Sequence, residues 1–194
     1  MSSTFKTSLL LRSQEDTDPA IGAPLKAVQQ TMGMVPNMYA AMVNLPALLD
    51  TYNHAYRKFR GEAGFTPVEQ EVVLLAISRA NSCHYCVAAH SFVGEKMSKV
   101  PGEIIGAIRS DQPIADGKLE ALRSFTRTMT DSRGNPTPED GRAFLDAGYS
   151  EIHILGIILA ISAKVISNYT NHIFHTDIDP AFEAHRWTVP NADA

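Results

Sequence analysis

The sequence has little of what marks a secreted, membrane-spanning or nucleic-acid-binding protein. Its first residues hold only a three-leucine patch, Leu9–Leu11, which is too short for the apolar core of a signal peptide. No segment approaches the roughly 20 uninterrupted apolar residues of a membrane helix. Lysine and arginine are scattered and the net charge is -4, so we expect no basic surface for nucleic acid. We therefore expect a cytoplasmic protein that binds neither a membrane nor nucleic acid.

The sequence also lacks alternating strand patterns and a glycine-rich phosphate-binding loop. Apolar residues recur with helical periods along most of the chain, which indicates an all-α fold. Since no strand leads into a glycine-rich loop, we expect no cofactor. A chain of 194 residues, 44% hydrophobic and 20% charged, is typical of one globular domain, residues 1–194. We divide it into an N-terminal arm (1–21), a helical core (about 22–180) and a C-terminal tail (186–194).

Two helix starts and one long apolar helix are distinctive within this core. Thr66, Pro67 and Glu69 have the spacing of a capping box, which predicts a helix that begins at residue 67. The next helix is expected to begin with Ser82 as its N-cap. The last long helix, over residues 150–174, is apolar on most sides. We therefore expect it to be buried in the core or against another subunit.

Cysteine is scarce, and both cysteines lie in one short stretch, NSCHYCVAAH (residues 81–90). In a reducing cytosol, a pair with this spacing is typical of catalysis or metal binding rather than of a permanent disulfide. Haem attachment would need a histidine directly after Cys86, where the chain has Val87. Zinc needs about four ligands, but only Cys83, Cys86 and His90 are suitably placed. Two unreactive core thiols remain an alternative, although they would not require the histidine.

The helix geometry around the cysteines favours nucleophilic chemistry. If Ser82 caps the helix, both thiols fall in or just beyond the first turn, where the helix dipole lowers the pKa of a cysteine. Cys86 and His90 are four residues apart and share one face, so the imidazole can accept the Cys86 proton. Cys83 lies a turn earlier and can form a disulfide with Cys86 after oxidation. Peroxide reduction requires this combination of one thiol to be oxidised, one to resolve it and an adjacent base.

A carboxylate is needed to orient the imidazole, and Glu71 is the candidate. If the two helices form an antiparallel hairpin with its turn near residues 80–82, His90 lies about 12 Å from the turn and Glu71 roughly 13 to 14 Å. The two side chains then reach the same depth. Glu69 points to the other side, but its helix is apolar almost all round and does not show which glutamate faces the partner helix. A solvated surface charge is the alternative for Glu71.

The chain carries the pattern E-x11-C-x2-C-x3-H, formed by Glu71, Cys83, Cys86 and His90. This pattern resembles the motif of the AhpD-like alkylhydroperoxidases of the carboxymuconolactone decarboxylase superfamily, most closely the branch called peroxidase-related proteins. The likeness covers roughly residues 25–175, because the segment before the motif and the last long helix are also similar. It implies an all-helical fold with the C-x-x-C at a helix N-terminus, assembly into trimers or hexamers, and thiol-dependent reduction of hydroperoxides in antioxidant defence.

The resemblance also implies a role for each residue of the motif. A proton relay would run from Glu71 through His90 to Cys86, which would attack the peroxide and become a sulfenic acid. Cys83 would then condense with it, and a thiol or a lipoyl- or thioredoxin-like partner would reduce the disulfide. The order of the two cysteines stays open, because in other C-x-x-C enzymes the first cysteine is the more exposed and acidic one.

One position departs from the family pattern. Some relatives carry a histidine directly before the second cysteine, where this chain has Tyr85 and places His84 one residue earlier. We interpret Tyr85 as a packing residue with a hydroxyl group and His84 as a surface histidine.

Three other functions remain as alternatives. A carboxymuconolactone decarboxylase moves protons on a lactone and lacks the cysteine pair, so Cys83 and Cys86 argue against that chemistry. A redox sensor needs an output surface, and the sequence shows no obvious one. A disulfide reductase or redox relay would use the same dithiol–disulfide cycle as a peroxidase.

Overall fold

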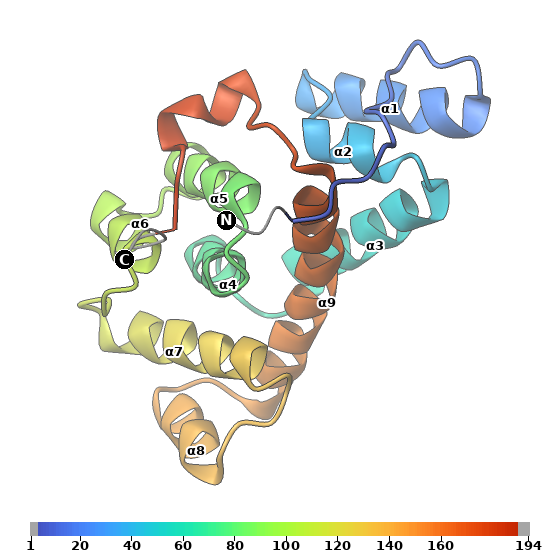
Figure 1. The fold of residues 1–194 in the computed structure, drawn as a ribbon. Helices are drawn as coiled ribbons and strands as arrows, with labels where there is room; N and C mark the ends of the chain where they lie inside the picture. The colour runs from blue at the N-terminus through green and yellow to red at the C-terminus, as the bar shows by residue number, and fades with distance from the viewer. Residues whose placement is uncertain (1–3, 190–194) are drawn as a thin grey trace.

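The computed structural model describes residues 4–189 and confirms the all-α fold (Figure 1). Within this range the chain forms only helices: α1 (Pro19–Met32), α2 (Asn37–Met42), α3 (Pro46–Glu62), α4 (Pro67–Ala80), α5 (His84–Lys96), α6 (Gly102–Arg109), α7 (Gly117–Asp131), α8 (Pro138–Asp146), α9 (Glu151–Phe174) and the short 3-10 helix η1 (Pro180–His185). The outermost residues of the expected arm and tail, 1–3 and 190–194, lie outside the described residues.

Helix α4 is the central element of the fold, and α5, α6, α7 and α9 pack around it (Figure 1). Its start confirms the predicted capping box. The Thr66 hydroxyl accepts a hydrogen bond from the Glu69 backbone N–H, and the Glu69 carboxylate accepts one from the Thr66 N–H. Pro67 occupies the first helical position, where no backbone donor is needed. Every residue from Glu69 to Ser78 is buried, which explains why the sequence of this helix shows no polar face.

Buried side chains form two apolar clusters. The larger one surrounds α4 and includes residues of α3, α6, α7, α8 and α9. The smaller one, here called the N-terminal cluster, joins α1, α2 and α3 to the start of α5 and to η1. It consists of Ile21, Leu25, Met38, Tyr39, Met42, Val43, Leu49, Tyr52, Cys83, Tyr85, Cys86, Ala88 and Phe182. Both cysteines therefore lie where the first three helices pack against the start of α5.

Helix α9 runs beside α2, α3 and α4 (Figure 1). By length and composition it could span a membrane, with a mean hydropathy of 1.6 over 18 residues, whereas we expected no such segment. Its buried face, however, is made of small and polar residues, among them Lys164, Asn168 and Asn171. Large apolar side chains point outward instead: Ile152, Leu155, Ile158, Tyr169 and Ile173. The helix is thus a core element of a helical domain. We expected it to be buried on most sides, but within this chain only one side is buried.

The N-terminal arm is shorter than expected. Helix α1 begins at Pro19, because the Asp18 side chain accepts a hydrogen bond from the Ala20 N–H and caps the helix. Residues 18–21 were expected to belong to the arm, but proline is favourable at the first helical position and α1 begins there. The helix ends at Gly33, whose φ of 75° is the left-handed conformation that glycine favours.

The described part of the C-terminal tail packs on its own chain. Trp187 is 6% exposed, and its indole N–H donates to the Arg109 carbonyl at 3.0 Å. The Arg79 guanidinium lies 5.3 Å from the centroid of the Trp187 ring, within range of a cation–π contact. The tail therefore covers the C-terminal ends of α4 and α6.

Candidate active site

The turn between α4 and α5 places both cysteines at the start of α5. Ser82 adopts a left-handed conformation with a φ of 53°. An N-cap residue needs an extended backbone, so the N-cap is Cys83 and the expectation of Ser82 was wrong by one residue. Cys86 is consequently the third helical residue. It lies in the first turn, where unpaired N–H groups and the helix dipole favour a thiolate.

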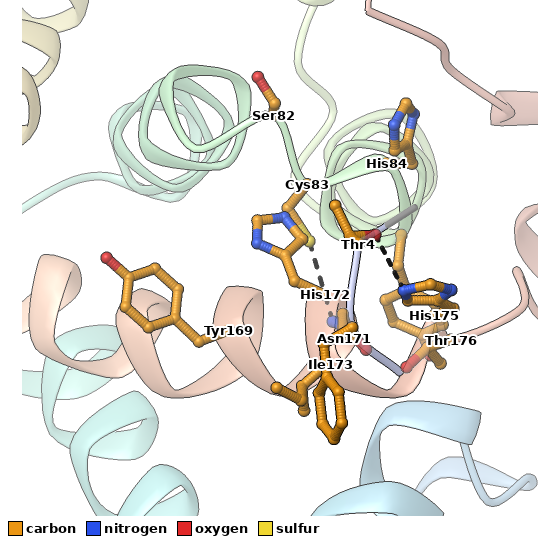
Figure 2. Close-up of a pocket in the computed structure, with 12 residues that line it drawn as sticks. Thr4, Ser82, Cys83, His84, Tyr169, Asn171, His172, Ile173, His175 and Thr176 are labelled. Atoms are coloured by element: carbon orange, nitrogen blue, oxygen red, sulfur yellow. Dashed lines mark hydrogen bonds between the residues drawn. The ribbon is translucent and has the colours of Figure 1, made fainter. Parts of the chain in front are cut away.

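Both thiols are free and buried, and an amide from α9 reaches them. The Nδ2 atom of Asn171 lies 3.3 Å from the Cys86 sulfur and 4.0 Å from the Cys83 sulfur. Figure 2 shows Asn171 below Cys83, with a contact drawn as a dashed line. An amide N–H aimed at the sulfurs stabilises negative charge there, and it favours the nearer Cys86.

The hairpin of α4 and α5 brings His90 and Glu71 together, which is the contact that the sequence predicted. The Nδ1 atom of His90 lies 3.0 Å from the Oε2 atom of Glu71, and both side chains are buried. The other carboxylate oxygen lies 2.5 Å from Arg60 Nη2 and accepts a hydrogen bond from the Ser98 hydroxyl at 3.3 Å. Glu71 is therefore a paired, buried carboxylate and not a solvated surface charge.

The structure also distinguishes the two glutamates of α4. Besides capping the helix, Glu69 accepts a hydrogen bond from the Tyr149 hydroxyl at 3.0 Å and lies 3.1 Å from the Lys118 ammonium. Two positions along an α-helix rotate a side chain by about 200°. Glu69 consequently faces α7 and the segment before α9, while Glu71 faces His90.

A buried lysine lies next to this network, and the sequence analysis did not identify it. Lys164 is 1% exposed and lines the same cavity as Cys86 and His90. Among residues 4–189, no carboxylate lies within salt-bridge distance of its ammonium group. The signal that could have revealed it is the one lysine in the middle of a long, largely apolar helix, since a buried charge requires a partner.

The pKa values of the two cysteines shift in opposite directions. Burial alone would raise the pKa of Cys86, but the hydrogen bond from Cys83 and the positive charge of Lys164 outweigh it. The pKa of Cys86 therefore falls well below its ordinary value. The pKa of Cys83 rises, because its thiol proton bonds to Cys86 and because the residue is buried. The opposite shifts indicate that Cys86 is the cysteine that loses its proton more readily, while Cys83 keeps its own.

His90 is a neutral base in the same cavity as Cys86. Burial and the charge of Lys164 lower the pKa of His90 more than Glu71 raises it. Burial raises the pKa of Glu71, but the bonds to His90 and Arg60 outweigh it and the pKa is lowered. A charged carboxylate only accepts, so we assign the proton to Nδ1 of His90, which donates to Glu71. The Nε2 atom keeps a lone pair for proton transfer.

Two cavities reach the cysteine pair. The first, here called the aromatic cavity, measures about 90 Å³ and is lined by Met32, Pro36, Met38, Tyr39, Tyr52, Tyr56, Tyr85, Cys86, Ala89, His90, Val93, Lys164 and Phe182. The second, here called the Cys83 pocket, measures about 810 Å³ and includes Asn171 and His172 among its lining residues (Figure 2). Cys86 lines the aromatic cavity, and Cys83 lines the larger pocket.

His84 and Tyr85, which lie between the cysteines, contact the C-terminal segment. His84 is exposed, and its Nδ1 atom lies 2.9 Å from the Trp187 carbonyl oxygen. Tyr85 is 3% exposed and donates its hydroxyl proton to Asp179 at 2.5 Å. These contacts fit the interpretation of a surface histidine and a packing tyrosine.

The zinc alternative requires several donor side chains to converge on one point. In the part of the chain that the structure describes, no group of three or more His, Cys, Asp or Glu side chains could hold a metal ion. His90, which was considered as a zinc ligand together with the cysteines, bonds to Glu71 instead.

Known proteins share both the motif region and the fold. The sequence pattern of the carboxymuconolactone decarboxylase family matches residues 45–127, which include Glu71, both cysteines and His90. Over this range the chain is similar to the carboxymuconolactone decarboxylase family. Lys164 and Asn171 lie outside the matched range. No curated protein sequence matches the chain.

Three solved structures illustrate this AhpD-like fold. The alkylhydroperoxidase AhpD core of a peroxidase-related protein from Ralstonia eutropha JMP134 is 19% identical, with a TM-score of 0.77, over 90% of this chain and 93% of that one. A peroxidase-related protein from Silicibacter sp. TM1040 is 19% identical, with a TM-score of 0.76, over 94% and 96%. The debrominase Bmp8, in a cysteine-to-alanine variant bound to 2,3,4-tribromopyrrole, is 17% identical, with a TM-score of 0.74, over 93% and 97%. These likenesses establish the fold alone.

Proposed function

We propose that this AhpD-like protein is an oxidoreductase that reduces organic hydroperoxides through a cycle between the Cys83–Cys86 dithiol and its disulfide. The proposal is based on the surroundings of Cys86. The pKa of Cys86 is lowered, its thiol shares a cavity with a neutral His90, and it accepts a hydrogen bond from the Cys83 thiol. A thiolate at neutral pH can attack a peroxide, and the adjacent thiol can trap the product as a disulfide.

The reaction begins when the Nε2 atom of His90 accepts the Cys86 proton, directly or through one water. The thiolate attacks one peroxide oxygen, the O–O bond breaks, and a Cys86 sulfenic acid and an alkoxide form. The alkoxide takes the proton from His90 and leaves as an alcohol. The Cys83 thiol then attacks the sulfenic sulfur, which forms the disulfide and releases water.

Other side chains of the site stabilise the thiolate and orient the imidazole. Lys164 and the Asn171 amide stabilise the Cys86 thiolate, which assigns the attack on peroxide to the second cysteine of the pair. Glu71 holds the tautomer of His90, and Arg60 in turn holds the carboxylate. The sequence left the order of the cysteines open, and the opposite pKa shifts are the basis for this assignment.

The aromatic cavity supports an organic hydroperoxide as the substrate. Its lining includes four tyrosines, two methionines and other apolar side chains, and Cys86, His90 and Lys164 add a thiol, an imidazole and an ammonium group. A peroxide group can meet the thiolate while an apolar substituent contacts the aromatic rings. The volume of about 90 Å³ favours a small alkyl or aryl substituent.

Trapping the sulfenic acid tests this proposal. The reduced Cys83→Ser and Cys86→Ser variants are treated with one equivalent of tert-butyl hydroperoxide and dimedone, and the labelled residue is located by mass spectrometry. We expect label on Cys86 in the first variant and none on Cys83 in the second. Label on Cys83 alone would reverse the assigned order, and no label with no alcohol formed would exclude peroxide reduction.

A parallel reaction with 2,3,4-tribromopyrrole distinguishes peroxide reduction from the chemistry named for Bmp8. Bromide release is measured under the same reducing conditions. We expect alcohol formation from the hydroperoxide to be faster by at least about an order of magnitude, and faster bromide release would contradict the proposal.

A further inference from the structure

We propose that the Tyr52 hydroxyl is a catalytic hydrogen-bond donor, which binds the peroxide oxygen that leaves as the alkoxide. This inference rests on the proposed function and specifies the class of peroxide that the site is suited to reduce. The class is alkyl hydroperoxides, because their leaving oxygen is strongly basic and gains most from such a donor.

Hydrogen bonding distinguishes the four tyrosines of the aromatic cavity. The Tyr56 hydroxyl accepts a hydrogen bond from Arg60 at 2.5 Å, and the Tyr85 hydroxyl donates to a carboxylate of the C-terminal segment. Among residues 4–189, the hydroxyls of Tyr39 and Tyr52 have no hydrogen-bond partner. Buried polar groups are usually paired, so a buried hydroxyl without a protein partner is available to a ligand.

Tyr52 is the better placed of these two tyrosines. It is 3% exposed, against 9% for Tyr39. The Tyr39 ring meets the Tyr52 ring edge-on at 5.9 Å, and the Tyr56 ring stacks on it at 5.7 Å, so the neighbouring rings fix its position. The charge of Cys86 contributes to the raised pKa of Tyr52 but not to that of Tyr39, which indicates that Tyr52 lies nearer the reacting sulfur.

The hydroxyl is protonated and does not touch the sulfur. Burial raises the pKa of Tyr52 well above its ordinary value, so the phenol keeps its proton at neutral pH and can donate. Within the described residues, the Cys86 sulfur accepts from the Asn171 amide and not from Tyr52. Tyr52 and Cys86 thus lie on the walls of one small cavity without bonding to each other, and a peroxide group can lie between them.

The position of this donor assigns it to the leaving oxygen. When the Cys86 thiolate attacks the terminal peroxide oxygen, an S–O bond forms, the O–O bond breaks and its electron pair passes to the alkoxy oxygen. Tyr52 donates a hydrogen bond to that oxygen and keeps its own proton, while His90 supplies the proton that completes the alcohol. A fixed donor in a cavity that excludes water stabilises such developing charge. A carboxylate leaving from a peroxy acid carries less basic charge and needs this donor less.

Two oxidants with different leaving groups test the inference. Stopped-flow oxidation of the reduced protein is measured with tert-butyl hydroperoxide and with peracetic acid freed of hydrogen peroxide. We expect Tyr52→Phe to slow the reaction with tert-butyl hydroperoxide about 10-fold or more and that with peracetic acid less than about 3-fold. Tyr85→Phe is the matched control, because it removes a hydroxyl that is already bound, and it should change both rates by the same factor. Equal slowing with both oxidants by Tyr52→Phe, or no slowing, would overturn the inference.

Stability and the pKa of Cys86 separate catalysis from a structural role. Since the Tyr52 hydroxyl has no partner among residues 4–189, Tyr52→Phe should not lower the urea midpoint, whereas Tyr85→Phe loses the bond to Asp179 and should lower it. Iodoacetamide alkylation should give Tyr52→Phe the same pKa of Cys86 as the wild type. A raised pKa of Cys86 that accounts for the whole loss of rate would overturn the role of Tyr52.

The two proposals fail in different ways. If neither oxidant oxidises the cysteine pair of the wild type, the proposed function is wrong. If both oxidise it but Tyr52→Phe shows no dependence on the leaving group, only the role of Tyr52 is wrong.

Discussion

The reactivity proposed for Cys86 depends on side chains from different helices that act on one sulfur. Cys83 precedes it by three residues, His90 follows it on α5, and Lys164 and Asn171 come from α9. The largest opposing effect is burial, which disfavours the thiolate. Removing any one of the stabilising partners should therefore raise the pKa of Cys86.

Lys164→Met tests whether the lysine charge offsets the effect of burial on the pKa of Cys86, because methionine keeps most of the side-chain volume and removes the charge. We expect the pKa of Cys86 to rise and oxidation by peroxide at pH 7 to slow about 10-fold or more, since one pKa unit changes the thiolate fraction up to tenfold. The difference in oxidation rate between the variant and the wild type should shrink as the pH rises, because the variant then regains its thiolate. The pKa is measured from the pH dependence of iodoacetamide alkylation at Cys86.

Stability separates this electrostatic role from a structural one. Replacing a buried charge with a hydrophobic residue of similar volume is often neutral or stabilising, so Lys164→Met should resist urea at least as well as the wild type. A slower variant that is also strongly destabilised, with an unchanged pKa of Cys86, would contradict the role assigned to Lys164.

The two glutamates of α4 provide a matched pair of variants. Glu71→Gln keeps the shape of the side chain but loses the carboxylate that holds His90, so we expect oxidation of the thiols to slow about 10²-fold. Glu69→Gln makes the same change two residues away and should lower stability while leaving the rate unchanged. Stopped-flow oxidation and urea unfolding measure the two effects. Equal slowing by both variants would exclude the relay through Glu71.

The sequence predicted the local part of the site and not the distant part. The contact of Glu71 with His90 follows from a hairpin of two adjacent helices, so residue counting along each helix was sufficient. Asn171 lies 85 residues from Cys86, and its place beside the sulfurs depends on how α9 packs. Helical periodicity contains no information about that packing, which is why Asn171 and Lys164 were missed.

At the scale of the helices, the sequence predicted the first residue of a helix correctly where a full capping box was present. The capping box at Thr66 predicted the start of α4. The start of α5 was wrong by one residue, because Ser82 is a good N-cap by type but adopts a left-handed turn conformation. The start of α1 was missed because residues 1–21 were assigned to an arm, although Asp18 caps a helix that begins at Pro19.

The capping box of α4 can be tested directly. Thr66→Ala removes the hydroxyl that accepts from the Glu69 N–H, and we expect the free energy of unfolding to fall by about 1 kcal/mol. Thr137→Ala removes the equivalent hydroxyl from α8 and is the matched control. Urea unfolding measures both. Thr66→Ala should also slow thiol oxidation slightly by loosening α4, whereas a change in rate with Thr137→Ala and none with Thr66→Ala would contradict this.

At the scale of the whole molecule, α9 exposes an apolar face that the chain does not cover. Leu155 is 60% exposed and Ile152 is 66% exposed on the same side of the helix. Exposed apolar patches of this kind mark association surfaces, and the oligomer inferred from sequence stays a prediction. We expect a trimer or hexamer by light scattering after size exclusion, and Leu155→Glu should shift it to smaller species. A wild-type monomer at micromolar concentration would contradict this prediction.

The central claim is that Cys86 and Cys83 form a peroxide-driven dithiol–disulfide pair. The most direct measurement is stopped-flow oxidation of the fully reduced protein by tert-butyl hydroperoxide, with free thiols counted before and after, in the wild type and in Cys86→Ser. We predict the loss of two thiols per chain for each peroxide consumed, dependence of this loss on Cys86, and full recovery of the thiols with a dithiol. Thiols that survive excess peroxide in the wild type would contradict it.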